Sequence, residues 1–97
     1  SNKEERYIKY LNLFLQDDNF ELMNKYVAEG NVTKAFECCH TLKGVVGNLG
    51  FRTLYTAVYE ACELLRAGKC EGVAAIIDDV RDNYNAIIEI ICNKLNK

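Results

Sequence analysis

The chain of 97 residues contains no proline and no tryptophan, and it has one histidine and one methionine. The absence of proline removes the strongest helix breaker, so long helices are favoured. The chain also lacks a basic cluster, and its formal net charge is −2. This charge argues against a nucleic-acid partner and against a helix-turn-helix DNA-binding domain. Its unbroken apolar runs fall far short of the ~20 residues that a membrane span needs. We therefore expect a cytoplasmic protein without a membrane contact.

The size and composition of the chain indicate one globular domain over residues 1–97. Hydrophobic residues make up 49% and charged residues 27%, a balance typical of a folded domain rather than of a disordered segment. Two domains would each be too small to bury a good core. We expect a monomer. Because the first residue is serine, Ser1-Asn2 is interpreted as a cleavage scar, and the domain is either free-standing or cut from a longer protein.

The five cysteines are odd in number and form no Cys-x-x-Cys motif; they are Cys38, Cys39, Cys62, Cys70 and Cys92. On a helix the adjacent pair would point about 100° apart, which makes a poor chelate. We interpret most of the cysteines as small buried side chains in a reducing compartment. A zinc site of cysteine and histidine ligands is the alternative.

Apolar residues recur at steps of three and four along most of the chain, which predicts helices. The predicted helices are residues 4–16, a segment between Asp18 and Gly30, a segment between Asn31 and Gly50, a segment from Leu54 to Gly68, and Val73 to Leu95. The isoleucine-rich residues 86–92 continue the apolar stripe of the last segment and are therefore assigned to a helix rather than to a strand.

Polar residues and glycines mark the ends of these helices. Asp18, with Glu21 three residues later, resembles a capping box, and Asn31 is a good N-cap. Gly30 and Gly50 are natural C-terminal stops. The short connections, about two to five residues each, make successive helices antiparallel neighbours. The predicted fold is all-α: an up-and-down four-helix bundle with an additional short N-terminal helix.

The only histidine begins the stretch HTLKGVVGNLGF, residues 40–51, inside the predicted third helix. This stretch places Gly44 and Gly47 in a helix interior, where each glycine costs about 1 kcal/mol relative to alanine. At about 100° per residue, both glycines fall on the flank of His40, away from the apolar stripe, and Lys43 borders them. Either another helix packs closely there and His40 is merely solvated, or another protein approaches the bare backbone and reaches the imidazole.

The second interpretation predicts an anionic group on the imidazole. Lys43 lies three residues after His40, so its ammonium can reach a group attached to the ring. A phosphoryl group, which carries nearly two negative charges near neutral pH, is the obvious candidate. A neutral imidazole is a nucleophile, and an exposed position keeps it accessible.

The same stretch resembles the central motif of histidine-containing phosphotransfer (HPt) domains, His-x-Leu-Lys-Gly-x-x-x-x-hydrophobic-Gly. The matching positions are His40, Leu42, Lys43, Gly44, Gly47, Asn48, Leu49 and Gly50. The resemblance extends over the whole chain, because the helix order, the place of the motif on the third helix and the size all agree. Phosphotransfer domains of chemotaxis kinases carry a similar stretch, and this subfamily stays open.

The resemblance implies a role for each residue of the motif. His40 would be the phosphoacceptor, which forms a phosphoramidate, and Lys43 would offset the charge of the phosphate. Gly44 and Gly47 would admit the active-site loops of a receiver domain. The implied function is a middle step of a two-component phosphorelay, in which the group passes between two receivers.

The resemblance also implies the partners. These are receiver domains of response regulators, one of which can belong to a hybrid sensor histidine kinase. The aspartyl phosphate and the Mg²⁺ would belong to the receiver, so this chain would need no metal and no cofactor of its own. Phe36 and Glu37 lie a turn before His40 and are further candidates for contact with the receiver. For Phe36 the alternative is burial.

Two other functions compete with this one. A kinase dimerisation segment also carries a helical histidine, but usually with an acidic residue after it and a proline a few residues later. Here Thr41 follows, and the chain has neither a proline nor a Gly-x-x-x-x-Gly-Lys phosphate loop. We therefore expect a carrier that does not phosphorylate itself from ATP. A helical interaction module without phosphate chemistry, which docks on a receiver or kinase, stays open.

Overall fold

A computed structural model describes residues 3–96 as five α-helices without a strand in that range. The helices are α1 (Lys3–Gln16), α2 (Asn19–Ala28), α3 (Val32–Leu49), α4 (Arg52–Arg66) and α5 (Val73–Leu95). The prediction of an all-α bundle is confirmed, and the isoleucine-rich residues 86–92 are helical. Ser1-Asn2, interpreted above as a cleavage scar, lies outside the described residues. No helix within residues 3–96 has the length and apolar character to cross a membrane.

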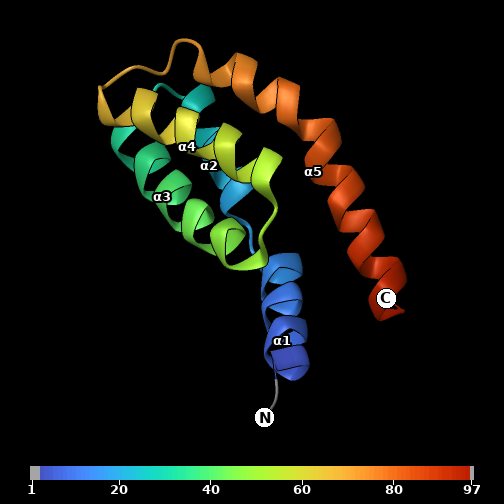
Figure 1. The fold of residues 1–97 in the computed structure, drawn as a ribbon. Helices are drawn as coiled ribbons and strands as arrows, with labels where there is room; N and C mark the ends of the chain where they lie inside the picture. The colour runs from blue at the N-terminus through green and yellow to red at the C-terminus, as the bar shows by residue number, and fades with distance from the viewer. Residues whose placement is uncertain (1–2, 97) are drawn as a thin grey trace.

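The helix α3 is central in the bundle and packs against α1, α2 and α4, while α5 packs against α2 and α4. Figure 1 shows α1 extending from the end of the bundle where α3 passes into α4. The phenol of Tyr7 on α1 donates a hydrogen bond to the carbonyl of Leu49, over 3.5 Å. With 14 residues, α1 is shorter than α3, α4 and α5, and α2 is the shortest helix with 10.

The core is apolar, and residues 3–96 include no buried polar or charged side chain. Aromatic rings join three of the helices. The ring of Tyr84 on α5 stacks on Phe20 of α2, with 4.2 Å between the centroids, and lies 5.4 Å from the ring of Phe14 on α1. The apolar stripe of α3 is buried as its periodicity predicts. It consists of Ala35, Cys39, Leu42, Val46 and Leu49.

The ends of α3 match their predicted caps. The side chain of Asn31 accepts a hydrogen bond from the backbone N–H of Lys34 over 3.2 Å. At the other end Gly50 has a φ of 74°, a left-handed conformation that glycine adopts without the steric cost of a Cβ. The chain therefore reverses within two residues and starts α4 antiparallel to α3.

The capping box at Asp18 was predicted wrongly. Asp18 has φ −106° and ψ 9°, and its side chain makes no capping hydrogen bond. An N-cap carboxylate reaches the free N–H groups from a β-region backbone, which Asp18 does not have. The neighbouring Asp17 instead accepts hydrogen bonds from the backbone N–H of Asn19, over 3.3 Å, and from its side-chain amide.

Candidate functional site

His40 lies on an exposed flank of α3, one residue after the buried Cys39. Its imidazole contacts the ring of Phe36, one turn earlier, with 5.8 Å between the centroids and 52° between the planes. Within residues 3–96 no hydrogen bond or ion pair engages the imidazole. Both ring nitrogens are therefore open to a reagent from solvent.

Lys43, three residues after His40 on α3, supplies the positive charge of the motif. Its side chain is half-buried, and its Nζ lies 5.3 Å from the centroid of the Tyr59 ring on α4. In the part of the chain that the structure describes, no carboxylate pairs with Lys43. Its charge is therefore not neutralised and can act on an anion bound nearby.

The two glycines after His40 have different surroundings. A Cβ built on Gly44 would meet nothing within 4 Å, whereas a Cβ on Gly47 would lie 3.3 Å from Cε2 of Tyr55. The prediction of a bare backbone is confirmed at Gly44 and is wrong at Gly47, because Gly47 faces α4 and the Tyr55 ring lies against it. A surface cavity of about 330 Å³ opens beside Gly47 and Tyr55, at the junction of α3 and α4.

The two candidates before His40 also differ from each other. Phe36 is half-buried, packs against the core, and has the guanidinium carbon of Arg66 5.2 Å from its ring centroid. Phe36 is therefore partly buried, as the alternative interpretation expected, and its ring also contacts the imidazole of His40. Glu37 is exposed, and its backbone carbonyl accepts a hydrogen bond from the Thr41 hydroxyl over 3.1 Å.

Helix α4 also contributes side chains to this site, which the motif around His40 does not indicate. Contacts that cross from α3 to α4 near His40 include Phe36 with Arg66, Lys43 with Tyr59, and Gly47 with Tyr55. Two of these α4 side chains are exposed, Tyr55 by 36% and Tyr59 by 47%. Tyr55, Tyr59 and Arg66 share one face of α4 by helical spacing, a signal that the sequence does contain. Their partners depend on the packing of two helices, which the sequence does not show.

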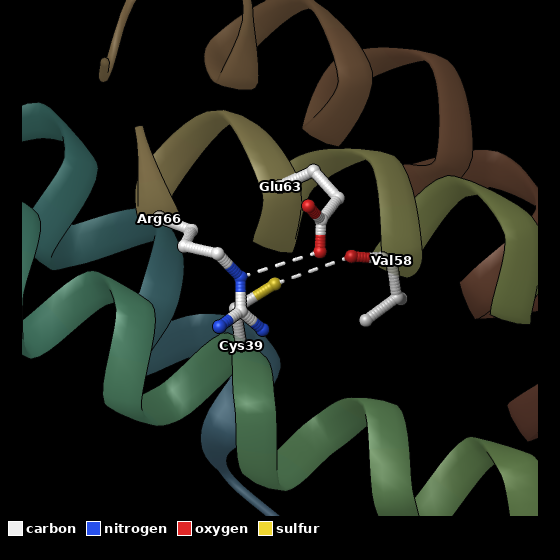
Figure 2. Close-up of polar contacts among 4 residues, drawn as sticks. All are labelled: Cys39, Val58, Glu63 and Arg66. Atoms are coloured by element: carbon white, nitrogen blue, oxygen red, sulfur yellow. Dashed lines mark hydrogen bonds and ion pairs between the residues drawn. The ribbon is translucent and has the colours of Figure 1, made fainter. Parts of the chain in front are cut away.

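Cys39 joins the same two helices from the buried side, as Figure 2 shows. Its thiol donates a hydrogen bond to the backbone carbonyl of Val58 over 3.4 Å. Burial, with Cys62 as a close neighbour, raises the pKa of the Cys39 thiol to about 12. A thiol with so high a pKa is a poor nucleophile, so Cys39 is a packing residue beneath His40. Figure 2 also shows the ion pair between Arg66 and Glu63, with 3.4 Å between Nε and Oε1.

The other cysteines complete this picture. Cys62 is buried, the remaining three are half-buried, and all five are free thiols. Residues 3–96 contain no group of three or more histidine, cysteine, aspartate or glutamate side chains placed to hold a metal ion. On α3 the neighbours of His40 thus supply an aromatic ring, an ammonium that no carboxylate pairs with among residues 3–96, and the bare backbone of Gly44. This set can accept an anionic group.

The comparisons with known proteins agree with this geometry. The profile of the Hpt domain family matches residues 9–90, a range that includes all of α3 and the stretch from residue 40 to residue 51. Comparison with curated proteins and with solved structures gave no match. Hpt domains are phosphotransfer carriers rather than ATP-using kinases, and they interact with receiver domains of two-component systems. Because the match covers far more than half of the chain, the protein belongs to the Hpt domain family.

Proposed function

We propose that His40 accepts a phosphoryl group from the aspartyl phosphate of one receiver domain and passes it to the aspartate of another. The observation that carries this proposal is the state of the only imidazole in the chain. It is exposed, neither ring nitrogen has a partner within residues 3–96, and it lies one turn from the bare backbone of Gly44. Such an imidazole is an accessible nucleophile.

The transfer forms one bond and breaks another. A lone pair on an imidazole nitrogen attacks the phosphorus and forms an N–P bond. The bond between phosphorus and the aspartyl oxygen breaks, and the carboxylate leaves with the electron pair. The proton on the other ring nitrogen stays there or passes to solvent. Passage to the second receiver runs in the opposite direction, with its aspartate as the nucleophile.

Both proteins contribute positive charge that stabilises the phosphoryl group during transfer. Phosphoryl transfer depends mainly on positioning and on electrostatic stabilisation of the phosphoryl oxygens. This chain contributes the Lys43 ammonium, which no carboxylate neutralises within the described residues. We assign the Mg²⁺ to the receiver, and this chain then requires no cofactor of its own.

The receiver is proposed to approach over Gly44. A side chain there would stand in open space on the flank of His40, so glycine leaves room for the loops of a partner. Phe36 and Glu37, on the preceding turn, border the same approach. Gly47 contributes less to this opening, because the Tyr55 ring already lies against it.

Transfer from charged receivers tests this function. A panel of purified receiver domains is phosphorylated with acetyl phosphate and mixed with this protein. We expect label on the wild type, with the acid lability and alkali stability of a phosphoramidate, and none on His40→Gln. The circular dichroism of the variant should be unchanged, because His40 is exposed. Label retained on His40→Gln would place the acceptor elsewhere, and receiver binding without any label would favour an interaction module without phosphate chemistry.

A further inference from the structure

We infer that Tyr59 is a positioning residue for the phosphorylated site: its ring holds the Lys43 ammonium where it can pair with a phosphoryl group on His40. The inference rests on the proposed role of His40 and adds a residue of α4 to it. The Lys43 ammonium beside the phosphoryl group affects both its transfer to His40 and its transfer from His40 to the next receiver.

The contact itself is a cation–π interaction. The Nζ of Lys43 lies 5.3 Å from the centroid of the Tyr59 ring, within the ~6 Å at which such an interaction is significant. A lysine side chain has several rotatable bonds and loses much rotamer freedom when it is held in one place. An aromatic ring restrains the ammonium without neutralising it, whereas a carboxylate would cancel the charge that a phosphoryl group needs.

The other cation on this side of the site is engaged differently. Arg66 forms an ion pair with Glu63 and lies over the ring of Phe36. Its charge is therefore shared with a carboxylate. Lys43 has no such partner in the part of the chain that the structure describes, so it is the cation that a phosphoryl group on His40 can recruit.

The direction of the two side chains supports the same role. Side chains on a helix lean toward the N-terminus of their own helix, and α3 and α4 are antiparallel. Lys43 therefore leans toward the turn of His40, while Tyr59 leans away from it. An ammonium that rests on an aromatic ring on one side keeps the N–H groups on its other side free to donate to a phosphoryl oxygen.

A measurement on the phosphohistidine tests this inference without a receiver. The protein is phosphorylated with phosphoramidate, whose P–N bond breaks as the imidazole N–P bond forms and ammonia leaves. The second acid dissociation constant of the phosphoryl group is then read from a ³¹P NMR pH titration, with His40→Gln identifying the signal. A nearby ammonium stabilises the dianion and raises this constant.

The variants separate a positioning role from a structural one. Lys43→Ala should lower the constant. Tyr59→Leu should lower it by up to about five-fold, because the linked change cannot exceed the free energy of the one exposed cation–π contact that is lost. Tyr59→Phe should keep the wild-type value, because the ring is retained. In the Lys43→Ala background, Tyr59→Leu should have no further effect.

Tyr7→Leu is the matched control. Tyr7 on α1 is also exposed, and its ring centroid lies 5.8 Å from a lysine Nζ, but that lysine is Lys94 on α5 rather than Lys43. The dissociation constant should therefore equal that of the wild type.

In the unphosphorylated protein, the ring current of Tyr59 should move the ε-methylene protons of Lys43 upfield. That displacement should persist in Tyr59→Phe and disappear in Tyr59→Leu, which reports the contact independently of phosphorylation.

Two results would overturn the inference. One is an unchanged constant in Tyr59→Leu, and the other is an equal decrease in the presence and absence of Lys43. Neither result affects the labelling of His40 by a receiver. Conversely, failure of every receiver to label His40 would refute the carrier function, while the titration with phosphoramidate would still be readable.

Discussion

Replacement of Gly44 by alanine tests why this position has no side chain: either another helix of the bundle packs closely there, or a partner protein approaches there. Gly44 lies in the interior of α3, is exposed, and would place a Cβ in open space. Alanine is about 1 kcal/mol more favourable than glycine in a helix interior, partly because it restricts the unfolded chain. Gly44→Ala should therefore raise the free energy of unfolding by up to about 1 kcal/mol.

Gly47→Ala is the matched comparison within the same helix. The gain in helix propensity is the same, but the new Cβ would lie 3.3 Å from Cε2 of Tyr55. The half-exposed tyrosine ring must move by a few tenths of an ångström, which offsets part of the gain. Gly44→Ala should therefore be the more stabilising of the two substitutions.

Urea denaturation at one pH and temperature measures both free energies, and thermal melts provide a second estimate. For a domain of this size, 1 kcal/mol corresponds to roughly 4–8 °C in Tm. Gly44→Leu extends the test to function: the fold should stay stable, while transfer from a charged receiver should slow sharply because the side chain fills the approach to His40. Destabilisation by Gly44→Ala would refute the open-surface reasoning, and normal transfer by Gly44→Leu would remove Gly44 from the receiver approach.

Two further predictions concern stability alone. Asn31→Ala should lower the free energy of unfolding by about 0.5–2 kcal/mol, because the side chain caps α3 through the N–H of Lys34; an unchanged urea midpoint would contradict this cap. Burial raises the pKa of Cys39 from 9.0 and that of Tyr84 from 10.0, each to about 12. As the pH rises, the unfolded chain releases these two protons before the folded chain does. The two groups therefore stabilise the folded state fully below pH 9, and this contribution is lost as the pH rises toward 12. Tyr84→Phe should remove the part of this decrease that starts near pH 10. The measurement is urea denaturation at several pH values between 8 and 11, and a wild-type free energy of unfolding that does not change over this range would contradict the raised pKa values.

The sequence by itself determined the helices and the exposure of the histidine. The apolar steps of α3 identify Cys39 and Leu42 as buried and place His40 on the solvent flank, as the structure has them. Asn31 and Gly50 end α3 where predicted, because capping is a local interaction between a residue and the backbone beside it. The motif around His40 also indicated the family, which the match over residues 9–90 confirms.

Only the tertiary structure decided what lies across from that flank. Gly44 and Gly47 look alike in the sequence, yet one faces open space and the other faces Tyr55. The contact between Lys43 and Tyr59 likewise joins residues that no local pattern connects. Periodicity records which side of its own helix each residue prefers to bury, a short-range property. The partner across an interface depends on the rotation and offset at which two helices pack, and these are set by the whole core.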